Sequence, residues 1–142
     1  MHTSARNQFL GTVTNIKPGP INAEVILKLE NENQIVAIIT QDSVNRLGLT
    51  EGSKAYALIK APQVILMSPH TGLKVSARNC LYGKVIGMIN GQVNAEISLE
   101  LSGGYVLKAV VTQSALKELD IKEGGPMYGI FKASQVILAV KE

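Results

Sequence analysis

Residues 22–40 read NAEVILKLENENQIVAIIT, two short apolar segments separated by the polar run ENEN. In the first segment Ala23, Val25 and Leu27 alternate with more polar neighbours, a period of two that is typical of a half-buried strand. The second segment, Gln34–Thr40, is a continuous run rich in β-branched residues, which suits a strand covered on both faces. Both segments are therefore predicted to be strands.

The flanking sequence predicts three further strands and one helix. An opening strand is expected over Phe9–Ile16. After the two central strands, Thr40 can cap a short helix that Gly48 ends. Two more strands are expected over Lys54–Lys60 and Val64–Leu66. Three strands, a helix and two strands are the element order of a five-stranded OB-type barrel.

The whole pattern occurs twice. Three motifs recur at a constant offset of 72 residues (76 − 4, 94 − 22, 132 − 60): Ser4-Ala5-Arg6-Asn7 with Ser76-Ala77-Arg78-Asn79, Asn22-Ala23-Glu24 with Asn94-Ala95-Glu96, and Lys60-Ala61 with Lys132-Ala133. At that offset the halves share about 25 identities without a gap. We predict a mainly β chain of two tandem OB-type barrels, each with one short helix: a module at 1–68, a linker at 69–73 and a module at 74–142.

The composition limits the class of protein. Of 142 residues 46% are hydrophobic and 18% charged, as in a globular protein, and the net charge is +3 without runs of Lys or Arg. Cys80 is the single cysteine, so no intrachain disulfide can form, and the N-terminal residues lack the apolar stretch of a secretory signal. We expect a cytoplasmic protein with no membrane span.

Catalytic machinery is absent from the pattern, whereas hydrogen-bond donors are repeated in it. The two histidines, His2 and His70, and Cys80 do not form a metal-cation site or a nucleophile–base pair. Each half repeats a Ser, an Arg, a Thr before the helix and a Lys. A dianion offers only acceptors, so such donors suit a tetrahedral oxyanion. The alternative is that these are ordinary surface residues copied by the duplication; their retention, while the exposed neighbour Lys54 changed to Pro126, favours binding.

The motifs together resemble those of the molbindins, specifically the members with two molybdopterin-binding-like (Mop) modules. The resemblance extends from Thr3 to Val140. It implies a trimer of two-module chains that binds molybdate or tungstate at interfaces between modules, without cofactor, for intracellular molybdenum storage and homeostasis.

The resemblance also implies two kinds of oxyanion site. The interface sites would use Ser4, Ala5, Arg6, Thr40, Ser43, Lys60 and Ala61 from the first module and Ser76, Ala77, Arg78, Thr112, Lys132, Ala133 and Ser134 from the second, with different chains contributing. A second kind, near the threefold axis, would use mainly main-chain groups of Asn22, Ala23, Asn94 and Ala95. Ser43 is replaced by Ala115 in the second half, and Pro62 by Ser134, so the two kinds of interface site can differ in affinity.

Three other functions are compatible with a small β-barrel module. An OB-type module can bind single-stranded nucleic acid by stacking bases on aromatic side chains, but aromatic residues are only 4% of this chain and Trp is absent. A stand-alone molybdate-sensing module would have to act without a helix-turn-helix segment or a P-loop. An enzyme of cofactor synthesis would need a nucleotide or pterin site, and no phosphate-binding glycine loop is present. We therefore predict a non-enzymatic oxyanion-binding protein with no nucleic-acid or membrane partner.

Overall fold

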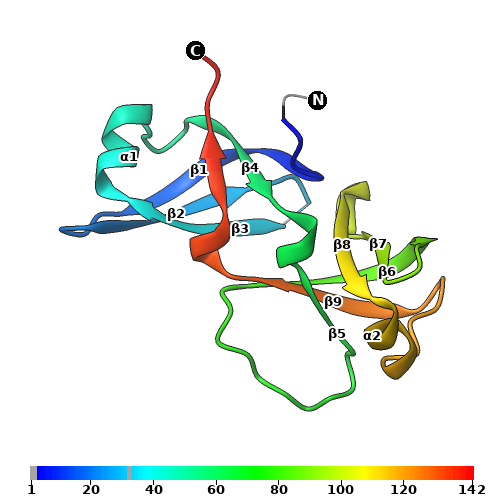
Figure 1. Ribbon diagram of the computed structural model, residues 1–142. Coiled ribbons are helices and arrows are strands. Elements are labelled where there is room, and N and C mark those ends of the chain that lie inside the picture. The colour runs from blue at the N-terminus through cyan, green and yellow to red at the C-terminus, as the bar shows by residue number, and fades with distance from the viewer. Residues whose placement is uncertain (1–2, 32) are drawn as a thin grey trace. The chain divides into compact units, whose positions relative to one another are not determined.

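The computed structural model describes residues 3–31 and 33–142, which form two compact units, each built on a five-stranded antiparallel sheet (Figure 1). The first unit contains β1 (Asn7–Lys17), β2 (Asn22–Lys28), β3 (Gln34–Thr40), α1 (Gln41–Leu47), β4 (Lys54–Ile59), the 3₁₀ turn η3 (Ala133–Gln135) and β10 (Ile137–Ala139). The second contains η1 (Ala61–Gln63), β5 (Ile65–Met67), β6 (Asn79–Asn90), β7 (Asn94–Glu100), η2 (Ser102–Gly104), β8 (Val106–Thr112), α2 (Gln113–Glu118) and β9 (Pro126–Phe131). The mainly β class with two five-stranded units is confirmed.

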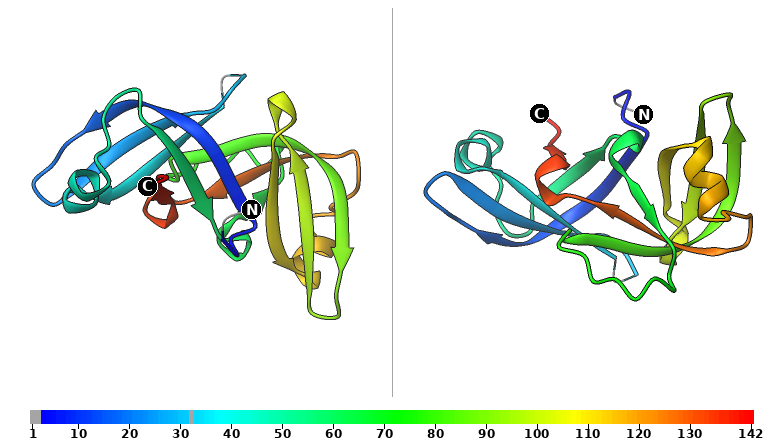
Figure 2. Two further views of the ribbon diagram at one scale, coloured as in Figure 1. Left: turned by 90° about the horizontal axis from the view of Figure 1, so that it is seen from above. Right: turned by 60° about the horizontal axis from the view of Figure 1, so that its bottom comes forward.

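The final strand of each sheet comes from the other repeat. The strand orders are β10-β4-β1-β2-β3 and β5-β9-β6-β7-β8. Ile137 of β10 pairs with Leu58 of β4, and Ile65 of β5 pairs with Ile130 of β9. The red C-terminal strand therefore lies beside β4 in Figures 1 and 2. Each repeat contributes four strands to one unit and its fifth strand to the other, so repeats and compact units do not coincide.

The two sheets curl in the same way. Register shifts occur between Val13 and Asn15 in β1 and between Val85 and Gly87 in β6, at equivalent positions 72 residues apart. A bulge of this kind bends a strand and increases its twist. In each unit the outer strands, β10 with β3 and β5 with β8, also contact each other. This closure is what an OB-type barrel requires.

The alternation predicted from the sequence defines the core. Ala23, Val25 and Leu27 of β2 point inward and are at most 2% exposed, while the residues between them are half-buried. Strand β2 ends at Lys28, because the Leu29 N–H bonds to the Asn33 carbonyl (2.8 Å) and closes the connection to β3. Burial of these side chains is the main stabilising contribution to each unit.

The helix begins and ends where the sequence predicted. The Thr40 hydroxyl accepts a hydrogen bond from the Ser43 N–H at 3.0 Å, and Gly48 adopts a left-handed conformation (φ 65°) at the C-cap. Val44 is buried against the sheet. Within the described residues no helix is long and apolar enough to cross a bilayer. The 3₁₀ turns η1, η2 and η3 were not predicted.

Candidate functional site

The Ser-Ala-Arg motif of each repeat leads directly into the first strand of its unit. In the first unit the Gln8 amide donates to the carbonyls of Thr3 (3.0 Å) and Ala5 (2.9 Å), which fixes the segment that carries Arg6. Cys80 stands in place of Gln8 in the second unit and cannot form these bonds. Burial raises the pKa of the Cys80 thiol, so this side chain stays neutral near pH 7.

Asn7 and Asn79, the last residues of these motifs, are each 1% exposed and have polar partners. The sequence prediction included the motif but gave the asparagines no role. Their identity in both repeats was the available signal. An amide side chain buried in an apolar core needs hydrogen-bond partners, so we expect these two residues to stabilise the start of β1 and of β6.

The Lys-Ala motif follows the strand that pairs with this start. Asn7 is in register with Ile59, so Arg6 and Lys60 flank the same end of the β1–β4 pair. The second unit repeats the arrangement, since Asn79 is in register with Phe131 and Lys132 follows. All four of these cationic side chains are exposed. Each repeat therefore has two cationic donors at one end of its β1–β4 or β6–β9 strand pair.

The remaining donors lie at the opposite end of the sheet. Asn22 is in register with Thr40, and Asn94 with Thr112, at the end of the sheet where β1 and β6 finish. Because β1 is 11 residues long, Arg6 at its beginning and Asn22 beyond its end belong to separate groups of one unit. We call them the cationic group (Ser4, Ala5, Arg6, Lys60 and Ala61, with Ser76, Ala77, Arg78, Lys132, Ala133 and Ser134) and the neutral group (Asn22, Ala23, Thr40 and Ser43, with Asn94, Ala95 and Thr112).

Hydroxyl protons in the neutral group are arranged differently in the two units. Thr40 donates its proton to the Ser43 oxygen (2.8 Å), which also accepts a bond from Arg46 (3.4 Å). The Ser43 proton is then the one that remains for a ligand. The Thr112 hydroxyl only accepts, from the Ala115 N–H at 3.1 Å, and makes no other hydrogen bond within the described part of the chain. Each unit thus keeps one hydroxyl donor here, on Ser43 in the first and on Thr112 in the second.

Four of the six alanines named for the sites are packing residues. Ala23 and Ala95 are 2% exposed, and Ala61 and Ala133 are 1% and 4% exposed. Their methyl groups fill the core, and these exposed fractions include the main chain, so little of any of the four residues is accessible in the single chain. The turns that carry Ala61 and Ala133 are held by the bonds from Gln63 N–H to Lys60 carbonyl and from Gln135 N–H to Lys132 carbonyl, both 3.0 Å.

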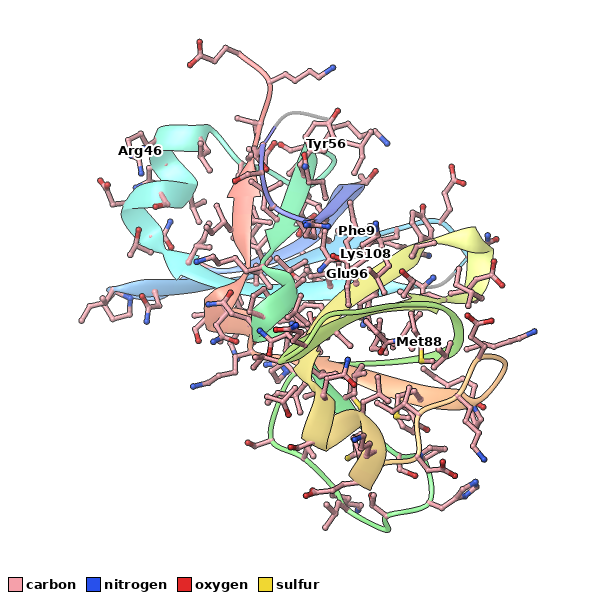
Figure 3. All side chains as sticks on the ribbon, turned by 45° about the vertical axis from the view of Figure 1, so that its right-hand side comes forward. Phe9, Arg46, Tyr56, Met88, Glu96 and Lys108 are labelled. Carbon is pink, nitrogen blue, oxygen red and sulfur yellow. The ribbon has the colours of Figure 1, made fainter. Side chains whose placement is uncertain are left out.

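Carboxylates close to the candidate groups are paired. Glu96, beside Ala95, lies 3.7 Å from Lys108 of the neighbouring strand (Figure 3), as expected from its poor suitability as an anion ligand. Asp42, in the first turn of α1, lies 3.7 Å from Arg46. Across residues 3–31 and 33–142 no group of three or more His, Cys, Asp or Glu could hold a metal ion. The arrangement offers donors and positive charge to a ligand, which is the chemistry of an anion site.

A pocket of about 240 Å³ in the second unit is a different kind of space. Its walls include Val85, Leu119 and Met127 together with linker residues such as Pro69. None of the candidate oxyanion residues lines it. Its largely apolar lining does not suit a dianion.

One protein family matches each of the two sequence repeats. The TOBE domain matches residues 3–66 and again residues 75–138. The chain belongs to the TOBE-domain family. Both TOBE domains span the four strands and the exchanged fifth strand of their repeat, so the family match delimits repeats rather than compact units.

Several relatives of this TOBE-domain protein have names connected with molybdenum. The molybdenum transport protein ModE of Azotobacter vinelandii is 43% identical over 140 residues, 99% of this chain and 52% of ModE. The molybdenum-pterin-binding protein MopA of Rhodobacter capsulatus is 40% identical over 99% of this chain and 53% of its own length. The chain thus spans about half the length of these curated relatives.

A solved structure matches the entire chain. The cytoplasmic molybdate-binding protein ModG, crystallised with molybdate bound, superimposes with a TM-score of 0.96 at 42% identity, covering 99% of this chain and 100% of ModG. The predicted resemblance to two-module molybdate-binding proteins is therefore confirmed at the level of family and fold.

Proposed function

We propose that this chain binds molybdate or tungstate as an intact oxyanion and performs no chemistry on it. The observation that carries the proposal is the whole-chain likeness to ModG, whose crystals contain molybdate. The role proposed for the chain is cytoplasmic molybdenum storage and homeostasis. It requires no cofactor, because reversible binding needs only a set of hydrogen-bond donors.

The donor chemistry supports an oxyanion of this type. The cationic group supplies Arg6 and Lys60 in one repeat and Arg78 and Lys132 in the other, and charge-assisted hydrogen bonds to an anion are about twice as strong as neutral ones. The neutral group adds the Ser43 or Thr112 hydroxyl. A fully deprotonated oxyanion needs no acceptor from the protein, whereas a protonated phosphate does.

Assembly into a homo-trimer is part of the proposal. The cationic and neutral groups of one repeat belong to opposite ends of its sheet, so a ligand that touches both draws on two repeats, which in the proposed trimer come from different chains. Large apolar side chains are also exposed at three equivalent pairs of positions, Leu10 and Tyr82, Ile21 and Val93, and Ile65 and Ile137. Burial of such residues between chains would stabilise an oligomer.

A second candidate function is molybdate sensing. The chain aligns over 99% of its length with half of ModE from Azotobacter vinelandii, and a ModE of Yersinia pestis is named a transcriptional regulator. A sensing module binds the same anion but passes the signal to a partner. Storage instead requires that several anions are held per chain.

The test is isothermal titration of the purified chain with molybdate and tungstate, with light scattering to measure the mass of the assembly. Sulfate, phosphate and a single-stranded oligonucleotide are the control ligands. We expect uptake of more than one molybdate per chain by a trimer and no heat from the controls. Heat from the oligonucleotide alone would replace this function by nucleic-acid binding.

Variants locate the binding groups. Arg6→Ala or Lys60→Ala removes a charge-assisted hydrogen bond worth about 1.5–3 kcal/mol, which corresponds to roughly 10- to 100-fold weaker molybdate binding. Lys28→Ala, an exposed lysine in neither group, is the matched control and should bind as the parent does. Parent-like affinity in the first two variants would remove Arg6 and Lys60 from the site.

A further inference from the structure

Gln113, the first residue of α2, is hydrogen-bonded to the turn between β6 and β7. The Gln113 side-chain amide donates to the Asn90 side-chain oxygen and to the Gly91 carbonyl, both at 3.0 Å. Its main-chain N–H donates to the Val93 carbonyl at 2.8 Å. One residue therefore bonds to both arms of the turn, and the turn itself is closed by the bond from Gly91 N–H to Asn94 carbonyl at 2.8 Å.

The first unit has the same glutamine without this connection. Gln41 keeps the main-chain bond to the Ile21 carbonyl (2.8 Å), but its amide donates to Asn45 within α1 at 3.2 Å. Pro18 stands in place of Asn90 and has no side-chain acceptor. The Gln41 side-chain oxygen is buried and has no hydrogen-bond partner among the residues that the structure describes. Here the ring constraints of Pro18 and Pro20, rather than a side-chain bond, restrict the turn.

This hydrogen-bonded turn is followed directly by the candidate oxyanion-binding residues Asn94 and Ala95. Asn94 and Ala95 begin β7, and Asn94 is in register with Thr112, the residue before Gln113. Asn94 is exposed, whereas Ala95 is 2% exposed over the whole residue, so the main-chain and side-chain groups that an anion can reach here are mainly those of Asn94. Main-chain donors bind an anion well only when they are held in the bound geometry beforehand, because otherwise binding must also order them.

We propose that Gln113 is a positioning residue for oxyanion binding at the start of β7, and that Gln41 has no such role at the start of β2. The inference rests on the proposed function and deepens it. Gln113 holds the Asn90–Val93 turn and hence the main chain of Asn94 and Ala95. The two equivalent sites then differ in what restricts the preceding turn. The Gln113 amide does so before β7, and Pro18 and Pro20 do so before β2.

The test compares Gln113→Met with Gln41→Met in the full chain. Methionine keeps the length of the side chain but cannot donate a hydrogen bond. Main-chain amide NMR signals are followed during titration with sodium molybdate, and amide hydrogen exchange is measured without it. Gln113→Met removes both side-chain hydrogen bonds, and one such bond is worth about 1 kcal/mol, so the molybdate concentration for half-saturation at Asn94 and Ala95 should rise at least about fivefold. Exchange at the Gly91 amide should accelerate by a similar factor.

The other signals serve as controls. Half-saturation at Asn22 and Ala23 should stay as in the parent in both variants, and Gln41→Met should leave all four signals unchanged. An unchanged half-saturation at Asn94 and Ala95 in Gln113→Met, or parent signals there that do not respond while molybdate binds elsewhere, would overturn the positioning role. A parent protein that takes up no molybdate would instead overturn the proposed function as well.

Discussion

The cores of the two units have the same strand arrangement but are filled by different side chains. In the first unit β4 presents Ala55, Ala57 and Ile59 to the core, and the aromatic ring comes from Phe9 on β1. In the second, β9 presents Met127, Gly129 and Phe131, so the aromatic ring has moved to the partner strand. Strand pairing and bulge are the same in both units. The comparison shows that either of the two paired strands can supply the aromatic ring of this core.

The largest loss of stability is expected from changes in the two exchanged fifth strands, β5 and β10. Leu66 of β5 and Leu138 of β10 are both 6% exposed, and truncation of a buried leucine to alanine costs about 2–5 kcal/mol. Leu66→Ala should accelerate hydrogen exchange in β6–β9, and Leu138→Ala should do so in β1–β4. Faster exchange in β1–β4 of Leu66→Ala would mean that each repeat retains its own fifth strand.

A smaller effect tests the difference in core packing. A methyl group on Gly129 would lie 2.5 Å from Leu107 Cδ2, so Gly129→Ala should destabilise the protein by about 1–3 kcal/mol in chemical denaturation. The first unit has Ala57 here and Ile35 in place of Leu107. Adding Leu107→Ile should therefore recover part of the loss. If the double variant is no more stable than Gly129→Ala, the Ala57–Ile35 pair of the first core cannot replace the Gly129–Leu107 pair of the second.

The smallest effect concerns the residue after the helix. Gly48 and Asp120 occupy equivalent positions with φ of 65° and 52°. A left-handed conformation costs an ordinary L residue roughly 1–2 kcal/mol, partly offset by the freedom of glycine in the unfolded chain, so Asp120→Gly should stabilise by about 0.5–1 kcal/mol. Thermal and urea melts measure this, and Gly48→Asp is the matched reverse change. A loss of stability in Asp120→Gly would show that the aspartate makes a compensating interaction.

The strands and helix caps could be predicted because they depend on neighbouring residues. The alternation at Ala23, Val25 and Leu27 and the pair Thr40 and Gly48 carry their own signals, one for burial and one for capping. The 3₁₀ turn at Ala61–Gln63 carries no comparable signal, because a single turn has neither period nor core face.

The exchange of strands could not be predicted, because the two exchanged segments are nearly the same. Residues 60–66 read KAPQVIL and residues 132–138 read KASQVIL, differing only at Pro62 and Ser134. Each fits either barrel equally well as far as its side chains are concerned. Pairing is then settled by the connections of the chain, which local patterns do not report.

The candidate site was predicted as sets of residues rather than as a geometry. The repeated motifs pointed to Arg6, Lys60, Thr40 and Asn22, and the sheet register separates them into a cationic and a neutral group at opposite ends of β1. The role of Gln113 had no signal in the motif itself, because Gln41 is identical in sequence. The difference arises from Asn90 and Pro18, more than 20 residues earlier in the chain.

The crossed fifth strands also govern what happens when the chain is cut. A protease that opens residues 69–73 leaves an N-terminal fragment ending in β5 and a C-terminal fragment ending in β10, and each sheet still needs strands from both. The nicked protein is a complementing pair whose fragments separate only by unfolding both barrels. Cleavage at residues 69–73 should therefore not separate the two fragments. Neither repeat by itself supplies all five strands of one of these sheets.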